Sequence, residues 1–419
     1  MHHFNYKNGI LHAEDVSLEN IAREVGTPAY VYSQATLIRH FKAFSKAFEG
    51  MDHLVCYAVK ANSNKAVMAL FASLGGGADI VSGGELARAL AAGVRPDRIV
   101  YSGVGKTVEE MEAALKAGIL MFNLESVDEL QVLDQAAGRL GVKAPVSFRV
   151  NPDVDAVTHP KITTGLAKNK FGLDMETAFR QYPMAAKLPN VEIKGISCHI
   201  GSQITDTRPF ADSLKRVARL VEKLGEIGIN LSLLDLGGGL GITYDQETPP
   251  HPEEYADALK ETVNRLGLKL ILEPGRVLVG NAGILLSQVL FTKQTPAKRF
   301  IIVDTAMNDL IRPSFYDSYH AIWPVEKARA EELATADVVG PICETGDFLA
   351  RDRRLPMFER GDLMALLSAG AYGFAMSSNY NSRPRAAEVL VNGDRFSLVR
   401  ERETLEDLSR GEALPDWLA

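Results

Sequence analysis

The stretch "ADIVSGGELARALAAGVRPDRIVYSG", residues 78–103, decides the fold of this chain of 419 residues. It contains a short apolar run (78–82), a segment whose apolar residues recur every three to four positions (83–93), and a second apolar run (98–103). The middle spacing, closed by a glycine, is typical of an amphipathic helix, and the flanking runs are typical of buried strands. The stretch therefore predicts a strand–helix–strand unit.

The same unit recurs over the first two thirds of the chain. Apolar runs alternate with helix-like segments such as 107–118, and the eight runs are 54–60, 78–82, 98–103, 120–126, 146–152, 193–202, 231–239 and 268–276. Eight consecutive strand–helix units favour an α/β fold of the (β/α)8 barrel type. An open α/β sheet is the alternative.

The pattern changes after about residue 280. Strand-like runs follow with few helices between them, at 287–292, 299–304, 337–344, 362–372 and 388–402. Asn-Gly pairs between alternating flanks, in "VLVNGDRFSLV" (389–399) and "FNYKNGILHA" (4–13), predict two hairpins. We therefore expect a barrel over residues 32–278 and a β-rich C-terminal domain over 279–419, which also takes residues 1–31.

The composition narrows the class of protein. The chain is 46% hydrophobic and 24% charged, with a formal charge of −7 and scattered basic residues, which favours neither nucleic acid nor an anionic membrane as a partner. No apolar run reaches the roughly 18 residues of a membrane span, and the N-terminus does not resemble a signal peptide. The three cysteines, Cys56, Cys198 and Cys343, are widely spaced, which argues against disulfides or a metal site and for the cytoplasm.

Polar residues, or in one case three glycines, follow nearly every predicted barrel strand. They are Lys60, Ser82, Glu125, Asn151, His199, Ser202, Gly237, Gly238, Gly239, Glu273 and Arg276. Chemistry in such barrels gathers at the C-terminal ends of the strands, so these residues predict one site. A lysine that ends a buried strand either reaches solvent or is held in a pocket to form a Schiff base.

The glycines of "DLGGGLG" (235–241) allow two interpretations. Backbone N–H groups there can cradle an anion, or the glycines serve a tight turn alone. The spacing does not match a dinucleotide motif, so a single phosphate is favoured over a nucleotide. Together with Lys60, a ring-sized His199 and an acid at Glu273, this suggests pyridoxal phosphate, whose ring nitrogen needs an acidic partner. Taken singly, His199 also suits a core histidine, and Glu273 an ion pair with Arg276.

Six motifs in order, "YAVKAN", "CHIGSQ", "GGGLG", "EPGR", "CETGD" and "AGAYG", resemble the pyridoxal-dependent decarboxylases built like alanine racemase. Within that group the chain is similar, over essentially its whole length, to the diaminopimelate decarboxylases. The resemblance implies a β-sandwich-like second domain and a homodimer with shared active sites. It implies decarboxylation of meso-2,6-diaminopimelate to L-lysine, the last step of lysine synthesis by this route.

The resemblance also implies roles for individual residues. Lys60 would hold the cofactor and His199 would stack on its ring. Phosphate and ring nitrogen would be bound by Ser202, Gly237, Gly238, Gly239, Glu273, Gly275 and Arg276, with Tyr372 close to cofactor and substrate. Cys343, as proton donor, and Glu344 would come from the partner subunit. Arg312 and Tyr316 resemble a clamp for the substrate carboxylate, and residues 158–172 resemble a mobile loop, with Lys161 where the family more often has tyrosine.

Three other functions remain open on the sequence. An ornithine- or arginine-type decarboxylase would share the cofactor motifs but should lack the "RPSFY" stretch (312–316). A Schiff-base aldolase on the same barrel would need neither Glu273 nor the cysteine. A non-catalytic binding protein would be favoured by the loss of Lys60 or Cys343, and both are present.

Overall fold

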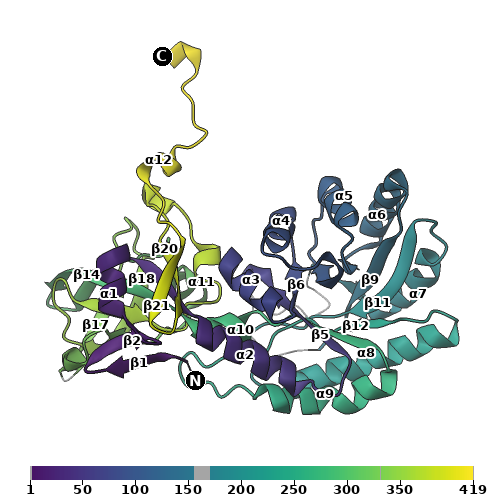
Figure 1. Cartoon of the computed structure of the whole chain (residues 1–419), viewed down its shortest axis with the longest axis horizontal. Coiled ribbons are helices and arrows are strands. Elements are labelled where there is room, and N and C mark those ends of the chain that lie inside the picture. Colours follow the sequence, from purple (N-terminus) through teal and green to yellow (C-terminus); the bar gives the residue numbers. More distant parts are fainter. Residues whose placement is uncertain (1, 155–169, 331, 419) are drawn as a thin grey trace. The chain divides into compact units, whose positions relative to one another are not determined.

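The computed structural model describes residues 2–154, 170–330 and 332–418 (Figure 1). Its internal contacts divide the chain into two units, residues 38–278 and residues 1–37 with 279–419. The sequence placed the first boundary at 31/32. It lies later because β4 (Ala29–Ser33) pairs with two strands of the second unit, β14 and β20.

The central sheet of residues 38–278 is a closed ring of eight parallel strands. Their order is β9, β11, β12, β13, β5, β6, β7 and β8, and β8 pairs again with β9. The strands are β5 (His53–Ala58), β6 (Gly77–Ile80), β7 (Ile99–Tyr101), β8 (Met121–Leu124), β9 (Ala144–Asn151), β11 (Val191–Ser197), β12 (Leu233–Asp235) and β13 (Lys269–Leu272). The short β10 (Leu173–Asp174) adds to β9. The barrel prediction is confirmed, and the closed ring excludes the open sheet.

Helices follow the strands, with ends set by local sequence. Ser82, Thr107 and Ser126 cap the N-termini of α4 (Gly83–Ala91), α5 (Val108–Ala117) and α6 (Val127–Leu140) through their side-chain oxygens. Gly118 and Gly141 end α5 and α6 in the left-handed conformation. Figure 1 shows these three helices side by side. The others are α2 (Gln34–Ala47), α3 (Lys65–Ser73), α7 (Met175–Ala185), α8 (Arg208–Glu226), α9 (Pro252–Leu266) and α10 (Arg276–Val279).

The second unit is rich in β-structure, as predicted. Its main sheet runs in the order β18, β17, β15, β14, β4, β20 and β21, with β19 pairing both β14 and β16. The strands are β14 (Gly283–Gln294), β15 (Arg299–Val303), β16 (Ile322–Pro324), β17 (Leu333–Val339), β18 (Phe348–Pro356), β19 (Leu363–Leu366), β20 (Ala387–Asn392) and β21 (Arg395–Arg400). β4 therefore places an N-terminal strand inside this sheet.

Both predicted hairpins form. β20 and β21 pair antiparallel with Asn392 opposite Arg395, so that Gly393 and Asp394 form the turn. β1 (Phe4–Lys7) pairs with β2 (Ile10–Ala13), which also pairs with β3 (Val16–Ser17). Apolar residues of β2 and α1 (Leu18–Val25), among them Leu11 and Ile21, pack in one core with Val31 and Val389. The tight turns form because Asn8 and Gly9 in the first hairpin, and Gly393 in the second, accept a left-handed backbone, with φ of 50°, 84° and 64°.

Three strand ends differ from the prediction. β5 ends at Ala58, so Lys60 lies in a short 3-10 turn (Val59–Ala61) and not in the strand. β17 ends at Val339, and β19 ends at Leu366. Cys343 and Tyr372 consequently lie on loops beyond their strands. The loop that carries Cys343 is exposed, whereas the apolar run that leads to Tyr372 continues beyond β19 as buried backbone.

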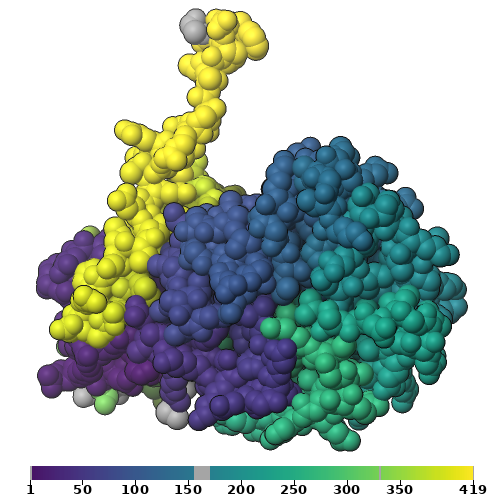
Figure 2. Space-filling model, turned by 45° about the vertical axis from the view of Figure 1, so that its right-hand side comes forward, coloured from purple at the N-terminus to yellow at the C-terminus, as the bar shows by residue number. Residues whose placement is uncertain are grey.

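The C-terminal residues extend beyond the sheet of their own unit (Figures 1 and 2). They include the one-turn helix α12 (Leu405–Leu408), whose residues are not buried. Leu405 is 75% exposed, and Trp417 is 84% exposed. Among the described helices of both units, none combines the length and the apolar character that a membrane crossing requires.

Candidate active site

A cavity of about 180 Å³ opens inside the barrel unit at the C-terminal ends of the strands. Lys60, His199 and Glu273, which the sequence predicted to act together, all line it. The other lining residues are Val81, Ser102, Gly103, Asn123, Arg149, Phe171, Ser197, Cys198 and Asp235. Charged and polar side chains thus meet in a cavity that apolar groups such as Val81 and Phe171 also line.

Lys60 is paired. Its ammonium lies 2.5 Å from Asp79 Oδ2, and the Asp79 side chain is fully buried while that of Lys60 is 37% exposed. Lys60 therefore keeps its charge at the edge of the cavity, because a buried carboxylate compensates it. The second oxygen of Asp79, Oδ1, has no hydrogen-bond partner among the described residues.

His199 follows β11 and presents a neutral ring to the cavity. The N–H of Gly238 donates to His199 Nδ1 over 3.3 Å. Burial lowers the pKa of the imidazole well below its usual range, and the charges of Arg149 and Lys60 lower it further. An imidazole held in this way at neutral pH offers a flat, uncharged face.

Glu273 lies beside a second carboxyl, that of Asp235. Asn123 Nδ2 donates to Asp235 Oδ2 over 2.8 Å and lies 3.5 Å from Glu273 Oε1. Burial raises the pKa of Glu273 well above its usual range, and the charges of Asp235 and Asp79 raise it further. Both effects favour the protonated form of Glu273.

Arg276 hydrogen-bonds polar groups around the next loop. Its guanidinium donates to Tyr244 Oη over 2.6 Å and to Ser202 Oγ over 3.1 Å. These partners place Ser202 and Arg276 together, as the sequence predicted for a phosphate site. The sequence also allowed an ion pair between Glu273 and Arg276. The two hydrogen bonds of Arg276 described above are made to Tyr244 and Ser202 and not to Glu273.

The three glycines after β12 lie where backbone segments approach each other. A Cβ at Gly238 would stand 2.2 Å from the carbonyl oxygen of Glu273, and one at Gly239 would stand 2.5 Å from that of Gly201. Gly237 and Gly239 have φ of 65° and 118°, a conformation that favours glycine. The tight turn by itself therefore accounts for these glycines. Gly275 is similarly close, because its Cβ would stand 3.0 Å from that of Ala61.

The remaining predicted residues lie in the β-rich unit. Arg312 begins α11 (Arg312–Tyr316), is buried, and lies 3.0 Å from His320 Nε2 and 3.2 Å from Ser318 Oγ. Tyr316 ends the same helix. These contacts hold the guanidinium within its own loop.

Cys343 and Glu344 lie together on an exposed loop. The N–H of Cys343 donates to Asn381 Oδ1 over 2.8 Å, and Tyr380 Oη donates to Glu344 over 2.7 Å. The Cys343 thiol is exposed. Tyr372 is half-buried and adopts a left-handed φ of 56°. Strain of this kind in a non-glycine residue commonly marks functional sites.

Several residues of the cavity escaped the sequence analysis. Asp79, Asn123, Arg149, Ser197 and Asp235 line or support it, and each stands inside or at the end of an apolar run. Such a run belongs to a strand buried on both faces, so a polar member must point into the barrel. Polar residues inside the apolar runs were therefore the sequence signal that could have identified these cavity residues. By contrast, Ser82 proves to be a helix cap, and Glu125 forms a buried ion pair of 2.8 Å with Arg149.

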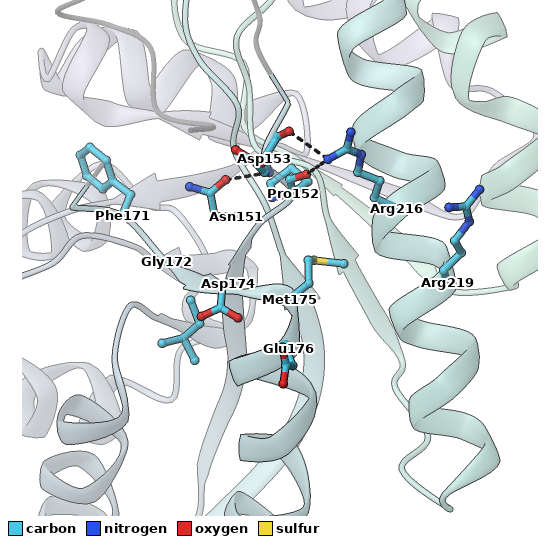
Figure 3. A pocket seen from close by; sticks show the side chains of 11 residues that line it. Asn151, Pro152, Asp153, Phe171, Gly172, Asp174, Met175, Glu176, Arg216 and Arg219 are labelled. Carbon is cyan, nitrogen blue, oxygen red and sulfur yellow. Dashed lines mark hydrogen bonds between the residues drawn. The ribbon is translucent and has the colours of Figure 1, made fainter. Parts of the chain in front are cut away.

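A second cavity, of about 590 Å³, lies between the end of β9 and helices α7 and α8 (Figure 3). Arg216 donates to the carbonyl oxygens of Pro152 and Asp153, and Asn151 accepts from the N–H of Asp153. These bonds hold the chain where it leaves β9. The predicted loop at 158–172, with Lys161, lies largely outside the described residues.

Comparison with known proteins connects this geometry to a family. Residues 34–280 match the model of the pyridoxal binding domain of pyridoxal-dependent decarboxylases. The chain is 55% identical to the diaminopimelate decarboxylase of Pseudomonas fluorescens, over 98% of this chain and 99% of that one. The chain belongs to the diaminopimelate decarboxylase family.

Solved structures of diaminopimelate decarboxylases share the whole fold. The enzyme from Helicobacter pylori, complexed with L-lysine, is 43% identical and superposes with a TM-score of 0.91, covering 94% of this chain and 98% of that one. The enzyme from M. jannaschii, in co-complex with L-lysine, is 40% identical with a TM-score of 0.95, covering 99% of both chains. The family thus accounts for both units of the chain.

Proposed function

We propose that this chain decarboxylates meso-2,6-diaminopimelate to L-lysine and CO2, using pyridoxal phosphate. Its 55% identity to a diaminopimelate decarboxylase over nearly the whole of both chains carries the proposal. Related structures hold L-lysine, which is the expected product. The decarboxylation would be the last step of lysine synthesis by the diaminopimelate route.

The residues of the cavity fit pyridoxal phosphate. An aldehyde needs an amine, and Lys60 offers one at the cavity edge. A pyridine nitrogen needs an acid, and Glu273 is buried with a raised pKa. The neutral face of His199 suits a stacked ring. We assign the phosphate to Ser202, Gly275, Arg276 and the loop of Gly237, Gly238 and Gly239, with Tyr372 near cofactor and substrate. The cofactor, when bound, accepts the electrons that CO2 leaves behind.

The protein's own groups would then manage protons and charge. Asp79 holds the Lys60 ammonium when the amine is not engaged. His199 stays neutral, so its face carries no charge that would compete with the ring. Glu273 supplies the proton that keeps the ring nitrogen positive. Cys343 would deliver a proton to the reacting carbon after CO2 has left.

Substrate choice would rest on groups in the β-rich unit. Arg312 and Tyr316 would hold the distal carboxylate, and Glu344 would receive the distal ammonium. A guanidinium suits this task because its planar fork can grip a carboxylate through two parallel bonds. The Arg312 guanidinium is held by Ser318 and His320, which would keep the fork oriented.

We propose further that the chain works as a homodimer with shared sites. Two features support this: the Cys343 thiol is exposed, and the C-terminal residues carry large apolar side chains that their own unit does not cover, including Leu405 and Trp417. A one-turn helix such as α12 is marginal in water unless something packs against it. A cytoplasmic location is supported by the three cysteines, which are free.

The test compares CO2 release from meso-diaminopimelate, ornithine, arginine and lysine side by side. Release from diaminopimelate alone supports the proposal, and faster release from ornithine or arginine supports the rival decarboxylases. Borohydride should abolish the visible band and fix the label at Lys60. A protein without a visible band and without CO2 release would be an aldolase or a binding protein.

A further inference from the structure

The carboxyl that the proposed function leaves without a role is Asp235. Asp235 ends β12, next to β13, and the residue is 1% exposed. Asn123 Nδ2 bridges it to Glu273, 2.8 Å from Asp235 Oδ2 and 3.5 Å from Glu273 Oε1. Two carboxylates that share so small a buried space cannot both be ionised without a large electrostatic cost. The pair therefore holds a proton at neutral pH.

The hydrogen-bond donors decide which carboxyl holds that proton. Each oxygen of Asp235 receives a short N–H bond, 2.9 Å from Gly237 to Oδ1 and 2.8 Å from Asn123 to Oδ2. The described donors to Glu273 are longer, 3.4 Å from Ser102 Oγ and 3.5 Å from Asn123. Short N–H bonds stabilise an ionised carboxylate. Asp235 is therefore the carboxylate of the pair and Glu273 the acid.

The orientation of Asn123 is itself determined. Ser147 Oγ donates to Asn123 Oδ1 over 2.6 Å, and lies 3.2 Å from Ser197 Oγ. Asn123 and Ser147 are register partners of β8 and β9, so the bond follows from the barrel's pairing. With its oxygen engaged by Ser147, the amide must direct its NH₂ group at the two carboxyls.

The other titratable groups around the pair leave this arrangement intact. On β6 and the turn after β5, the Asp79 carboxylate and the Lys60 ammonium neutralise each other. On β9, Arg149 is paired with Glu125. Burial keeps the nearby groups uncharged, since it lowers the pKa of His199 and raises the pKa of the Cys56 and Cys198 thiols.

We propose that Asp235 is a positioning residue that keeps Glu273 protonated until a pyridine nitrogen reaches it. The inference rests on the proposed function. A neutral ring nitrogen would then take the proton from Glu273: the O–H bond breaks, its electron pair stays on the carboxylate, and the N–H bond forms. Asp235 stays ionised throughout, so the ring is protonated from within the barrel and not from solvent.

Infrared spectroscopy of the full chain freed of cofactor tests this directly. The C=O stretching band of protonated Glu273 is obtained from the difference between the spectra of the wild type and Glu273→Gln. This band is followed from pH 5 to pH 10. We expect the band to persist at pH 8 in the wild type. Removing the neighbouring charge in Asp235→Asn should lower its midpoint by about one to three pH units. Asp235→Ser provides a second neutral variant if the asparagine, whose NH₂ would face Asn123, prevents folding.

A matched control separates this band from other buried carboxyls. Burial raises the pKa of Asp309, in the other unit, to about 7, and that of Glu85 to about 7. Both are largely ionised at pH 8, so Asp309→Asn should leave the band at pH 8 unchanged. A wild type without a Glu273 band at pH 8, or a midpoint that neither neutral variant lowers, overturns the inference.

Calorimetry of pyridoxal phosphate binding gives an independent readout. Titrations in two buffers of different ionisation enthalpy count the protons taken up. At a pH where only the variant has lost the Glu273 proton, Asp235→Asn should take up about one proton more than the wild type. Equal uptake at that pH overturns the inference. Failure of the wild type to bind pyridoxal phosphate overturns the proposed function instead, while the infrared titration still reports on Asp235.

Discussion

Replacing Gly238 with alanine should destabilise the barrel, because Gly238 lies where two strand ends meet. A Cβ there would stand 2.2 Å from the carbonyl oxygen of Glu273 and 3.0 Å from its carbonyl carbon. Carbon and oxygen in contact need about 3.3 Å. Neither neighbour is the movable end of a side chain, so one backbone segment must shift by roughly 1 Å.

The size of the effect follows from that shift. Inserting a carbon into a packed interior costs about 1–3 kcal/mol. The movement also strains the 2.8 Å hydrogen bond from the N–H of Glu273 to the oxygen of Gly237, whose loss would add about 1 kcal/mol. A total of about 2–4 kcal/mol corresponds to a fall in Tm of about 4–16 °C for a unit of this size.

The loss of stability is measured by thermal unfolding of Gly238→Ala, with Gly225→Ala as the matched control. Gly225 lies in α8, and a Cβ there would meet nothing within 4 Å. That substitution should raise stability by about 0.4–1 kcal/mol, since alanine restricts the unfolded chain. Pyridoxal phosphate, followed by its visible band, should bind Gly238→Ala at least about tenfold more weakly, because Gly238 orients His199. A Gly238→Ala variant that melts within about 1 °C of the wild type and binds equally well would refute the reasoning.

Four further outcomes are expected. Lys60→Ala should fold but lose turnover, and near-normal CO2 release would contradict the role of the amine. Mixing Lys60→Ala with Cys343→Ala chains should restore part of the activity if the two residues come from different subunits; no recovery despite proven subunit exchange would place both in one chain. Arg312→Ala should lower kcat/KM for diaminopimelate by tens- to thousands-fold, because truncating one partner of a buried charge pair costs about 2–5 kcal/mol. Arg312→Lys should recover part of the loss. A loss within about threefold in Arg312→Ala would contradict the role of Arg312 in binding the distal carboxylate. Burial raises the pKa of Asp309 to about 7. In the folded protein Asp309 therefore keeps a proton that it loses above about pH 4 in the unfolded chain. The contribution of Asp309 to the free energy of unfolding consequently falls as the pH rises from about 4 to 7. Urea unfolding should therefore show that Asp309→Asn gains stability relative to the wild type between pH 5 and pH 8, by up to about 3 kcal/mol. An equal difference at the two pH values would contradict this.

Local patterns in the sequence were sufficient for the architecture. The eight apolar runs became the eight barrel strands, and each Asn-Gly pair, at 8–9 and 392–393, marked a hairpin. These signals are short in range, since strand burial, helix spacing and turn chemistry are each encoded within about ten residues. The grouping of Lys60, His199 and Glu273 in one cavity also followed, because parallel strands bring their C-terminal ends to the same side.

Only the tertiary structure decided the partners of those residues. Asp79 as the counter-ion of Lys60, and Asn123 as the bridge between Asp235 and Glu273, join positions 19, 112 and 150 residues apart. Which polar side chains meet inside a barrel depends on the register of its strands, and a shift of one residue would turn each of them to the other face. The sequence by itself therefore determined the fold and the chemical groups of the site, whereas the closed barrel decided which group holds the charge and which holds the proton.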